Sequence, residues 1–201
     1  MWHHSCRWAA IWGLACFSVA LPVQAQWALA PSASQVGVTI TERTATESIP
    51  HQHRLRGLAG EVDDDGTLRL PLRLNQLDVL DRFDELPPWL AGLADRPLVT
   101  LTASVDTSRL DALTPGSELV ESVMFHAKGQ QAPVRLRFSR LDEESIRVTQ
   151  AEPLSLDARE VRDDPVGRSV LALLGYDNIR NAIPVTLDAR LVRAVGSPAQ
   201  P

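Results

Sequence analysis

The chain has 201 residues, a net charge of −5 at pH 7, 44% hydrophobic residues and two cysteines. An acidic balance argues against a nucleic-acid partner and against binding to an anionic membrane surface. Lys128 is the only lysine, and the arginines are scattered along the sequence, so we expect no basic patch.

Residues 1–25 have the layout of a secretory signal peptide. Arg7 precedes the uncharged apolar run "WAAIWGLACFSVAL", and the small-residue sequence "PVQA" predicts cleavage after Ala25. We therefore expect a periplasmic or secreted protein whose net charge, without Arg7, changes from −5 to −6. The run is too short for a comfortable membrane span, so no stable membrane insertion is expected after cleavage. A lipoprotein anchor at Cys16 is a weaker alternative, because Gly13 stands where a bulky aliphatic residue is needed.

After removal of this segment, the protein contains no cysteine. Cys6 and Cys16 both fall in the signal, so the exported protein has no disulfide and depends on its hydrophobic core. Residues 26–194 are enough for one domain, and residues 195–201 are expected to form a disordered tail.

Alternation of apolar and polar residues with period two dominates the domain and is typical of strands with one apolar face. In chain order the predicted strands lie in "QVGVTI", "HRLRGLAGEV", "TLRLPLRLNQL", "LVTLTASV", "ELVESVMFHA", "PVRLRF", "SIRVTQAEPLSLDA" and "IPVTLDARLV". Turn sequences such as "DDDGT", "TPGS" and "KGQQAP" separate them. We therefore expect about eight antiparallel strands.

Two segments break the alternation and predict short helices. The first, residues 76–95, has helical spacing interrupted at Pro87 and Pro88. In the second, "DDPVGRSVLALLGYD", Asp164 predicts the N-cap, and a glycine follows the apolar stripe where the helix ends. Eight amphipathic strands and two helical segments in one domain predict a mainly β fold, either a closed barrel or a two-sheet sandwich.

Several stretches resemble the YceI-like family, whose members are exported lipocalin-like barrels that bind polyisoprenoid lipids. "WALAPSASQVGVTI" is similar to the family's opening strand, and "HQHRLRGLAGEV" to its His-containing second strand. "MFHAKGQQAPVRL" is similar to its hairpin, and "AEPLSLDAREV" and "IPVTLDARL" to its last two strands. The likeness covers roughly residues 27–194. It implies an eight-stranded antiparallel lipocalin-like β-barrel that is a binder or carrier and not an enzyme.

An apolar chain held in the barrel interior is the ligand that this resemblance implies. The sequence itself favours such a guest, because inward positions are mid-sized aliphatics and aromatic residues are only 5% of the chain. Trp89 is a possible lid, and no cofactor is expected apart from a bound isoprenoid lipid. The predicted interior residues are Val36, Val38, Ile40, Leu70, Leu72, Leu101, Ala103, Phe125, Leu136, Phe138, Leu156 and Leu187.

Three histidines leave a second function open. His51, His53 and His126 could form a three-histidine zinc centre of a periplasmic hydrolase, since residues two apart on a strand share a face. We favour surface or rim histidines instead, because His126 is expected to face outward. A third alternative is a solid barrel that acts through protein partners. The sequence does not give the oligomeric state.

Overall fold

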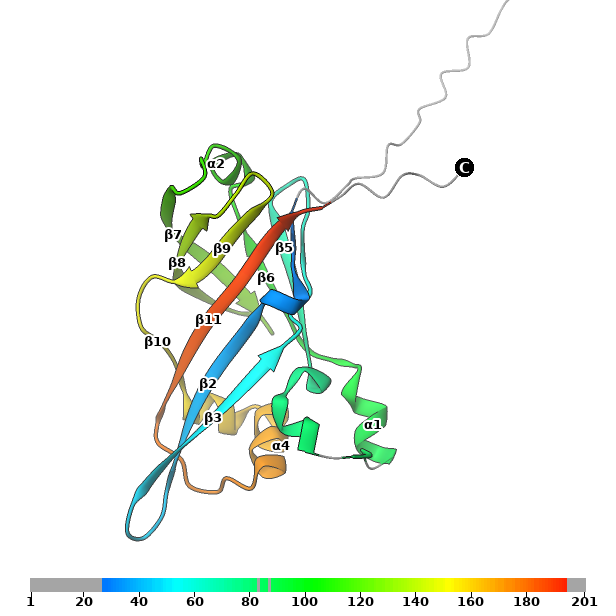
Figure 1. Cartoon of the computed structure of the whole chain (residues 1–201). Helices are drawn as coiled ribbons and strands as arrows, with labels where there is room; N and C mark the ends of the chain where they lie inside the picture. The colour runs from blue at the N-terminus through cyan, green and yellow to red at the C-terminus, as the bar shows by residue number, and fades with distance from the viewer. Residues whose placement is uncertain (1–26, 83, 87, 195–201) are drawn as a thin grey trace, which may run out of the picture.

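A computed structural model describes residues 27–82, 84–86 and 88–194, and antiparallel strands form most of this part of the chain (Figure 1). The predicted signal peptide and tail lie outside the described residues. The strands are β1 (Trp27–Leu29), β2 (Gln35–Arg43), β3 (Ser48–Arg56), β4 (Glu61–Val62), β5 (Thr67–Arg73), β6 (Pro97–Ser104), β7 (Glu118–Ala127), β8 (Gln130–Arg140), β9 (Ser145–Gln150), β10 (Leu154–Asp157) and β11 (Ala182–Arg193). The helices are α1 (Pro88–Ala94), α2 (Thr107–Asp111), α3 (Ala158–Asp163) and α4 (Pro165–Leu174), with short 3-10 helices η1 (Pro31–Ala33), η2 (Leu74–Gln76) and η3 (Asp78–Arg82).

Eight of the strands close into a ring. Hydrogen-bonded neighbours follow the order β1, β4, β5, β6, β7, β8, β9 and β11, and β1 pairs with β11 to complete it. Every pairing in the ring is antiparallel. The predicted eight-stranded antiparallel barrel is therefore confirmed, and closure leaves no free edge among these strands.

β11 is long enough to serve two neighbours on each side. Its residues 188–192 pair with β9 and residues 191–193 with β1, whereas residues 185–188 pair with β2 and residues 182–185 with β10. The β2–β3 hairpin therefore extends the wall beyond the closed ring. α2 lies at one end of the molecule, and α1 and α4 lie at the other (Figure 1). We call these the closed end and the helical end.

The predicted strand "HRLRGLAGEV" is in fact two strands, β3 and β4. The chain leaves β3 at Gly57, whose φ of +67° is in the left-handed region that favours glycine. It then passes so close to β5 that a Cβ on Gly60 would lie 2.7 Å from the carbonyl oxygen of Arg69. The break lets the β2–β3 hairpin separate from the ring while β4 rejoins it beside β1.

Among the helices, α4 begins and ends as predicted. The Asp164 carboxylate accepts a hydrogen bond from the Gly167 N–H at 2.9 Å, and Gly175 ends the helix with a φ of 78°. The sequence pattern does not predict α2 and α3, and residue 158, which the pattern assigns to a strand, begins a helix. No helix in the described part of the chain is both long enough and apolar enough to cross a membrane.

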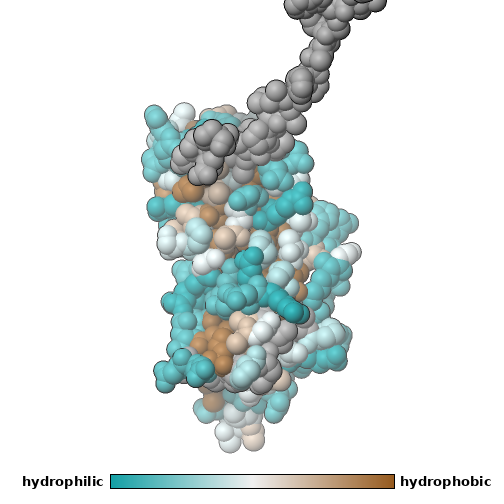
Figure 2. All heavy atoms as spheres, turned by 90° about the vertical axis from the view of Figure 1, so that its right-hand side faces the viewer, coloured by the Kyte–Doolittle hydropathy of each residue, from teal (hydrophilic) through white to brown (hydrophobic). Residues whose placement is uncertain are grey.

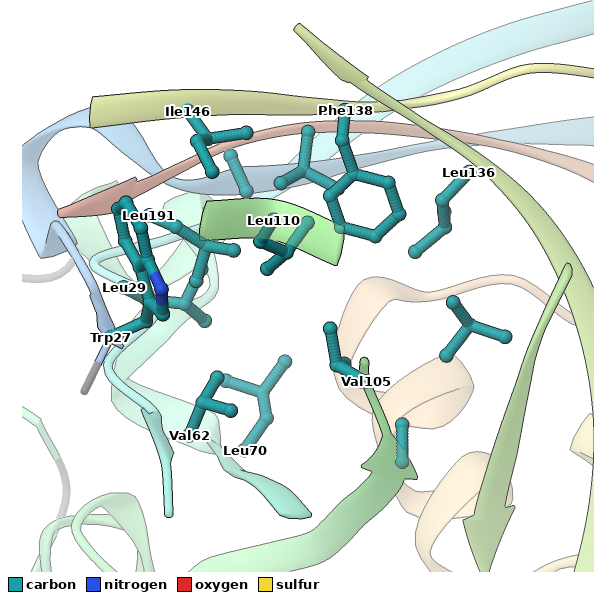
Figure 3. Packing of buried hydrophobic residues seen from close by; sticks show 14 of the residues in the cluster. Trp27, Leu29, Val62, Leu70, Val105, Leu110, Leu136, Phe138, Ile146 and Leu191 are labelled. Atoms are coloured by element: carbon teal, nitrogen blue, oxygen red, sulfur yellow. The ribbon is translucent and has the colours of Figure 1, made fainter. Parts of the chain in front are cut away.

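The closed end is filled by side chains. Trp27, Phe138, Leu110 and Ile146 are at most 2% exposed, and Leu110 comes from α2. Figure 3 shows these side chains converging from the surrounding elements. The guanidinium of Arg140, which is itself buried, lies 5.1 Å from the centre of the Trp27 ring, a cation–π contact within the filled end.

Candidate functional site

The inner face of the barrel holds most of the predicted interior residues. Cross-strand pairing aligns Leu187 with Val36 and Val36 with Leu55, and it aligns Leu70 with Leu101. Directly opposite residues on antiparallel strands point to the same face, so these aliphatic side chains line the interior together. Five of the predicted residues are buried: Ile40, Leu70, Ala103, Leu136 and Phe138.

Other inner-face side chains keep part of their surface exposed. These half-buried residues are Val36, Val38, Leu72, Leu101, Phe125 and Leu187. All but Val38 pack against the main core cluster, so their exposure is not that of outward-facing residues. A side chain on the inner face stays partly accessible only where its neighbours leave space beside it. These six residues are therefore less deeply buried than the side chains that fill the closed end.

Leu156 departs from the expected set. It lies on β10, outside the closed ring, and is 46% exposed. Its pairing with Ile183, which is buried, places it on the same face of the sheet, but at an edge that no further described strand covers. The assignment of Leu156 to the barrel interior was wrong, because that assignment treated residues 145–158 as one strand of the ring.

Helices and 3-10 helices cover the helical end. Leu171 of α4 packs with Ile40 of β2, while Leu77 and Leu80 pack with one another and with Leu174. Trp89, the possible lid, lies on α1, but its side chain is outside the described part of the structure. On the face shown in Figure 2, hydrophobic residues reach the surface in small areas between larger hydrophilic ones.

A polar cluster that the sequence analysis missed lies beside this apolar cover. His53 Nε2 is 3.0 Å from the Tyr176 hydroxyl, and His53 Nδ1 is 3.7 Å from Asp78 Oδ1. His51 stacks on the Tyr176 ring with centroids 4.7 Å apart, and its Nε2 lies 3.1 Å from Glu42 Oε2. The cluster thus joins β2, β3, η3 and the segment after α4.

The expectation of surface or rim histidines was therefore wrong for His53, which is only 4% exposed. On β3, His53 pairs with Val38 and His51 with Ile40, so both histidines share the inner face with aliphatic residues. Tyr176 is 123 residues away in the sequence, and no local pattern predicts that contact. The burial of His53 could have been predicted from the strand alternation, which places His51, His53 and Leu55 on one face.

The structure does not bring the three histidines together. His126 lies on β7, opposite Thr102 and Gln131, and is exposed on the outer face as predicted. Among the described residues, no three His, Cys, Asp or Glu side chains are grouped so that they could hold a metal ion. Nothing in the geometry favours the zinc hydrolase alternative.

Several solved chains are similar to this one, and one of them matches most of its length. It is a polyisoprenoid binding domain from Saccharophagus degradans implicated in plant cell wall breakdown, with a TM-score of 0.66 and 20% sequence identity. The match covers 85% of this chain and 100% of that domain. The two proteins share a fold. No protein-family model and no curated protein matches the sequence.

That shared fold is the lipocalin-like barrel that the sequence analysis expected. The similar domain is named for binding and not for catalysis. In this chain the barrel combines a filled closed end, a half-buried aliphatic middle and a polar cluster at the helical end. Such an arrangement suits contact with an apolar molecule, and the His53–Tyr176 pair adds hydrogen-bonding groups at the helical end.

Proposed function

We propose that this protein is an exported, non-catalytic binder or carrier of an apolar, chain-like ligand, a polyisoprenoid lipid, held in the barrel interior. The single observation that carries the proposal is the partial exposure of inner-face aliphatics such as Val36, Leu101 and Leu187. Partly accessible aliphatic side chains on an inner face favour an apolar guest. Burial contributes about 0.8 kcal/mol per CH₂ group, so a long prenyl chain binds tightly with few polar contacts.

The direction of entry follows from the two ends of the barrel. Trp27 and Phe138 fill the closed end, where they are 0% and 2% exposed. The ligand therefore enters at the helical end, where short helices can separate with less loss of packing than a closed strand ring. Export is supported by the signal sequence "WAAIWGLACFSVAL" with its following "PVQA".

A pair of variants on β6 tests the site. Leu101 lies on the inner face, whereas its neighbour Thr100 is exposed on the outer face. We expect Leu101→Trp to weaken binding of geranylgeraniol to the delipidated protein by at least tenfold. Displacing two methylene groups from the interior costs about 1.6 kcal/mol, which is slightly more than a factor of ten in affinity. Isothermal titration calorimetry measures both affinities.

Thr100→Trp is the matched control, because it adds the same indole to the outer surface of the same strand. It should bind geranylgeraniol like the wild type. Thermal unfolding checks that each variant is folded, and Leu101→Phe replaces Leu101→Trp if the larger side chain prevents folding. Equal affinities for the inner and outer variants would contradict an interior site, as would a wild-type protein that binds no geranylgeraniol.

A further inference from the structure

A groove lies on the outer face of the barrel, separate from the interior. η1, the start of β2, the end of β3 and the outer faces of β9 and β11 surround a space of about 720 Å³. The strands that form it lie side by side in Figure 1. This volume is in the range of roughly 300–1,000 Å³ that is typical of small-molecule sites.

Arginines from three strands meet in this groove. Arg147 of β9 and Arg190 of β11 are directly opposite each other, and Arg56 of β3 is opposite Gln35 of β2. Gln35 in turn is opposite Asp188, so the three guanidinium groups surround one short stretch of sheet. Strand pairing brings together arginines that are far apart in the sequence, where no run of basic residues predicts such a group.

The groove continues beside β2 into a hollow of about 60 Å³ that is lined by Arg54, Gln35 and Asp188. Together the two linings carry four arginines, at positions 54, 56, 147 and 190, and one carboxylate, Asp188, while two more carboxylates, Asp81 beside Arg56 and Asp142 near Arg190, lie just outside them. The whole chain has a net charge of −5. This face is therefore an exception on an acidic protein, and it attracts anions.

Neighbouring carboxylates neutralise only part of this charge. Asp188 accepts hydrogen bonds from Arg147 at 2.8 and 2.9 Å, which raises the pKa of Arg147. Arg56 pairs with Asp81, but both side chains are more than half exposed, and exposed pairs contribute little. Arg190 is in none of the ion pairs found between described residues, but it interacts electrostatically with Asp142. The Ser145 hydroxyl, and to a smaller extent Arg190, lowers the pKa of Asp142.

Like charges directly opposite on neighbouring strands destabilise a sheet, and Arg147 and Arg190 are such a pair. Asp188, which binds Arg147, offsets part of this repulsion, and an anion bound beside Arg190 offsets more of it. Each guanidinium group presents a planar set of hydrogen-bond donors that matches the oxygens of a phosphate. Three guanidinium groups together suit an anion with several charged oxygens better than they suit a single carboxylate. Pro31, Ala33 and Leu141, which is 42% exposed, add apolar surface at the rim for an organic part of the ligand.

We propose that this outer groove binds a phosphate-bearing ligand, with Arg56, Arg147 and Arg190 contacting the phosphate oxygens. The site does not depend on the lipid-binding proposal, because its side chains lie on the opposite face of the wall from the interior. The phosphate belongs either to a small soluble molecule or to a phospholipid headgroup. The two sources are distinguished by experiment.

Two probes test the groove in the full-length exported protein. Calorimetric titration with inorganic pyrophosphate tests a soluble ligand, and sedimentation with phosphatidylcholine vesicles, with or without phosphatidylglycerol, tests a headgroup. Arg190→Gln should weaken whichever interaction is found by roughly tenfold or more, the loss of a charge-assisted hydrogen bond. Arg137→Gln is the matched control, since Arg137 lies on β8 beside Glu118, outside the groove lining.

Each outcome decides the proposal. Arg190-dependent pyrophosphate binding supports a soluble phosphate ligand, and Arg190-dependent binding to phosphatidylglycerol vesicles supports a headgroup. Binding that Arg190→Gln and Arg137→Gln reduce equally reflects general charge attraction and overturns the proposal. It is overturned equally if neither probe binds the wild-type protein.

Discussion

His53 shows how one residue couples the barrel wall to its cover. β3 carries it into the interior, where it is 4% exposed and contacts Tyr176 from the segment after α4 and Asp78 from η3. A buried imidazole needs hydrogen-bonding partners, because an unpaired polar group in an apolar environment is costly. The hydrogen bond with the Tyr176 hydroxyl, with Asp78 Oδ1 nearby at 3.7 Å as a charged neighbour, therefore explains why a histidine is tolerated beside Leu55.

Truncation of His53 should destabilise the protein. His53→Ala leaves the Tyr176 hydroxyl without this contact and creates a cavity, so we expect the free energy of unfolding to fall by about 2 kcal/mol. Urea denaturation measures it. His126→Ala, at an exposed position on β7, should change it by less than about 0.5 kcal/mol.

The comparison of these two histidine variants is decisive for the structural role of His53. Equal effects of His53→Ala and His126→Ala would contradict a buried, hydrogen-bonded His53. Replacement of both His51 and His53 by glutamine is expected to leave lipid binding intact, since glutamine keeps hydrogen-bonding capacity. Calorimetry with geranylgeraniol measures that binding separately from stability.

At the scale of elements, helices and strands marked by local sequence features could be predicted, whereas those that depend on contacts between distant residues could not. α4 could be predicted because Asp164 and Gly175 mark its ends locally. α2 and α3 have only five and six residues, too few for a helical apolar period, although Asp106 and Asp157 cap them. The capping residues are visible in the sequence, but each follows an alternating pattern that predicts a strand, so no helix was predicted there. The break between β3 and β4 depends on contacts with β5 that sequence spacing does not reveal.

The N-cap of α4 gives a prediction at this scale. Asp164→Ala removes the acceptor for the Gly167 N–H and should lower the free energy of unfolding by about 1 kcal/mol. Asp164→Asn keeps a capping oxygen and should lose only a few tenths of a kcal/mol, although it also removes the charge that pairs with Lys128. Urea denaturation of both variants compares the cap with the ion pair. Equal destabilisation by alanine and asparagine would show that the ion pair, not the cap, stabilises α4.

At the scale of the whole molecule, the alternating pattern predicted a barrel or a sandwich, and only the family resemblance favoured the barrel. Neither predicted how its interior is filled. Inner and outer faces follow from period two, so Val36 and Leu187 could be assigned to the interior in advance. Their half-buried state depends on which side chains meet across the barrel, and Trp27 and Phe138 meet only at one end. The outer groove was equally hidden, because Arg56, Arg147 and Arg190 become neighbours only through strand pairing.

Carriage of a lipid in this interior is the central claim, and mass spectrometry of organic extracts tests it most directly. The full-length protein is purified without detergent from the cells that naturally produce it, and its extract is compared with that of the Leu101→Trp variant. We predict a prenyl lipid in stoichiometric amount with the wild-type protein and strongly reduced in the variant. Repeated absence of any stoichiometric lipid from the wild-type extract, or equal amounts from both proteins, would contradict the account.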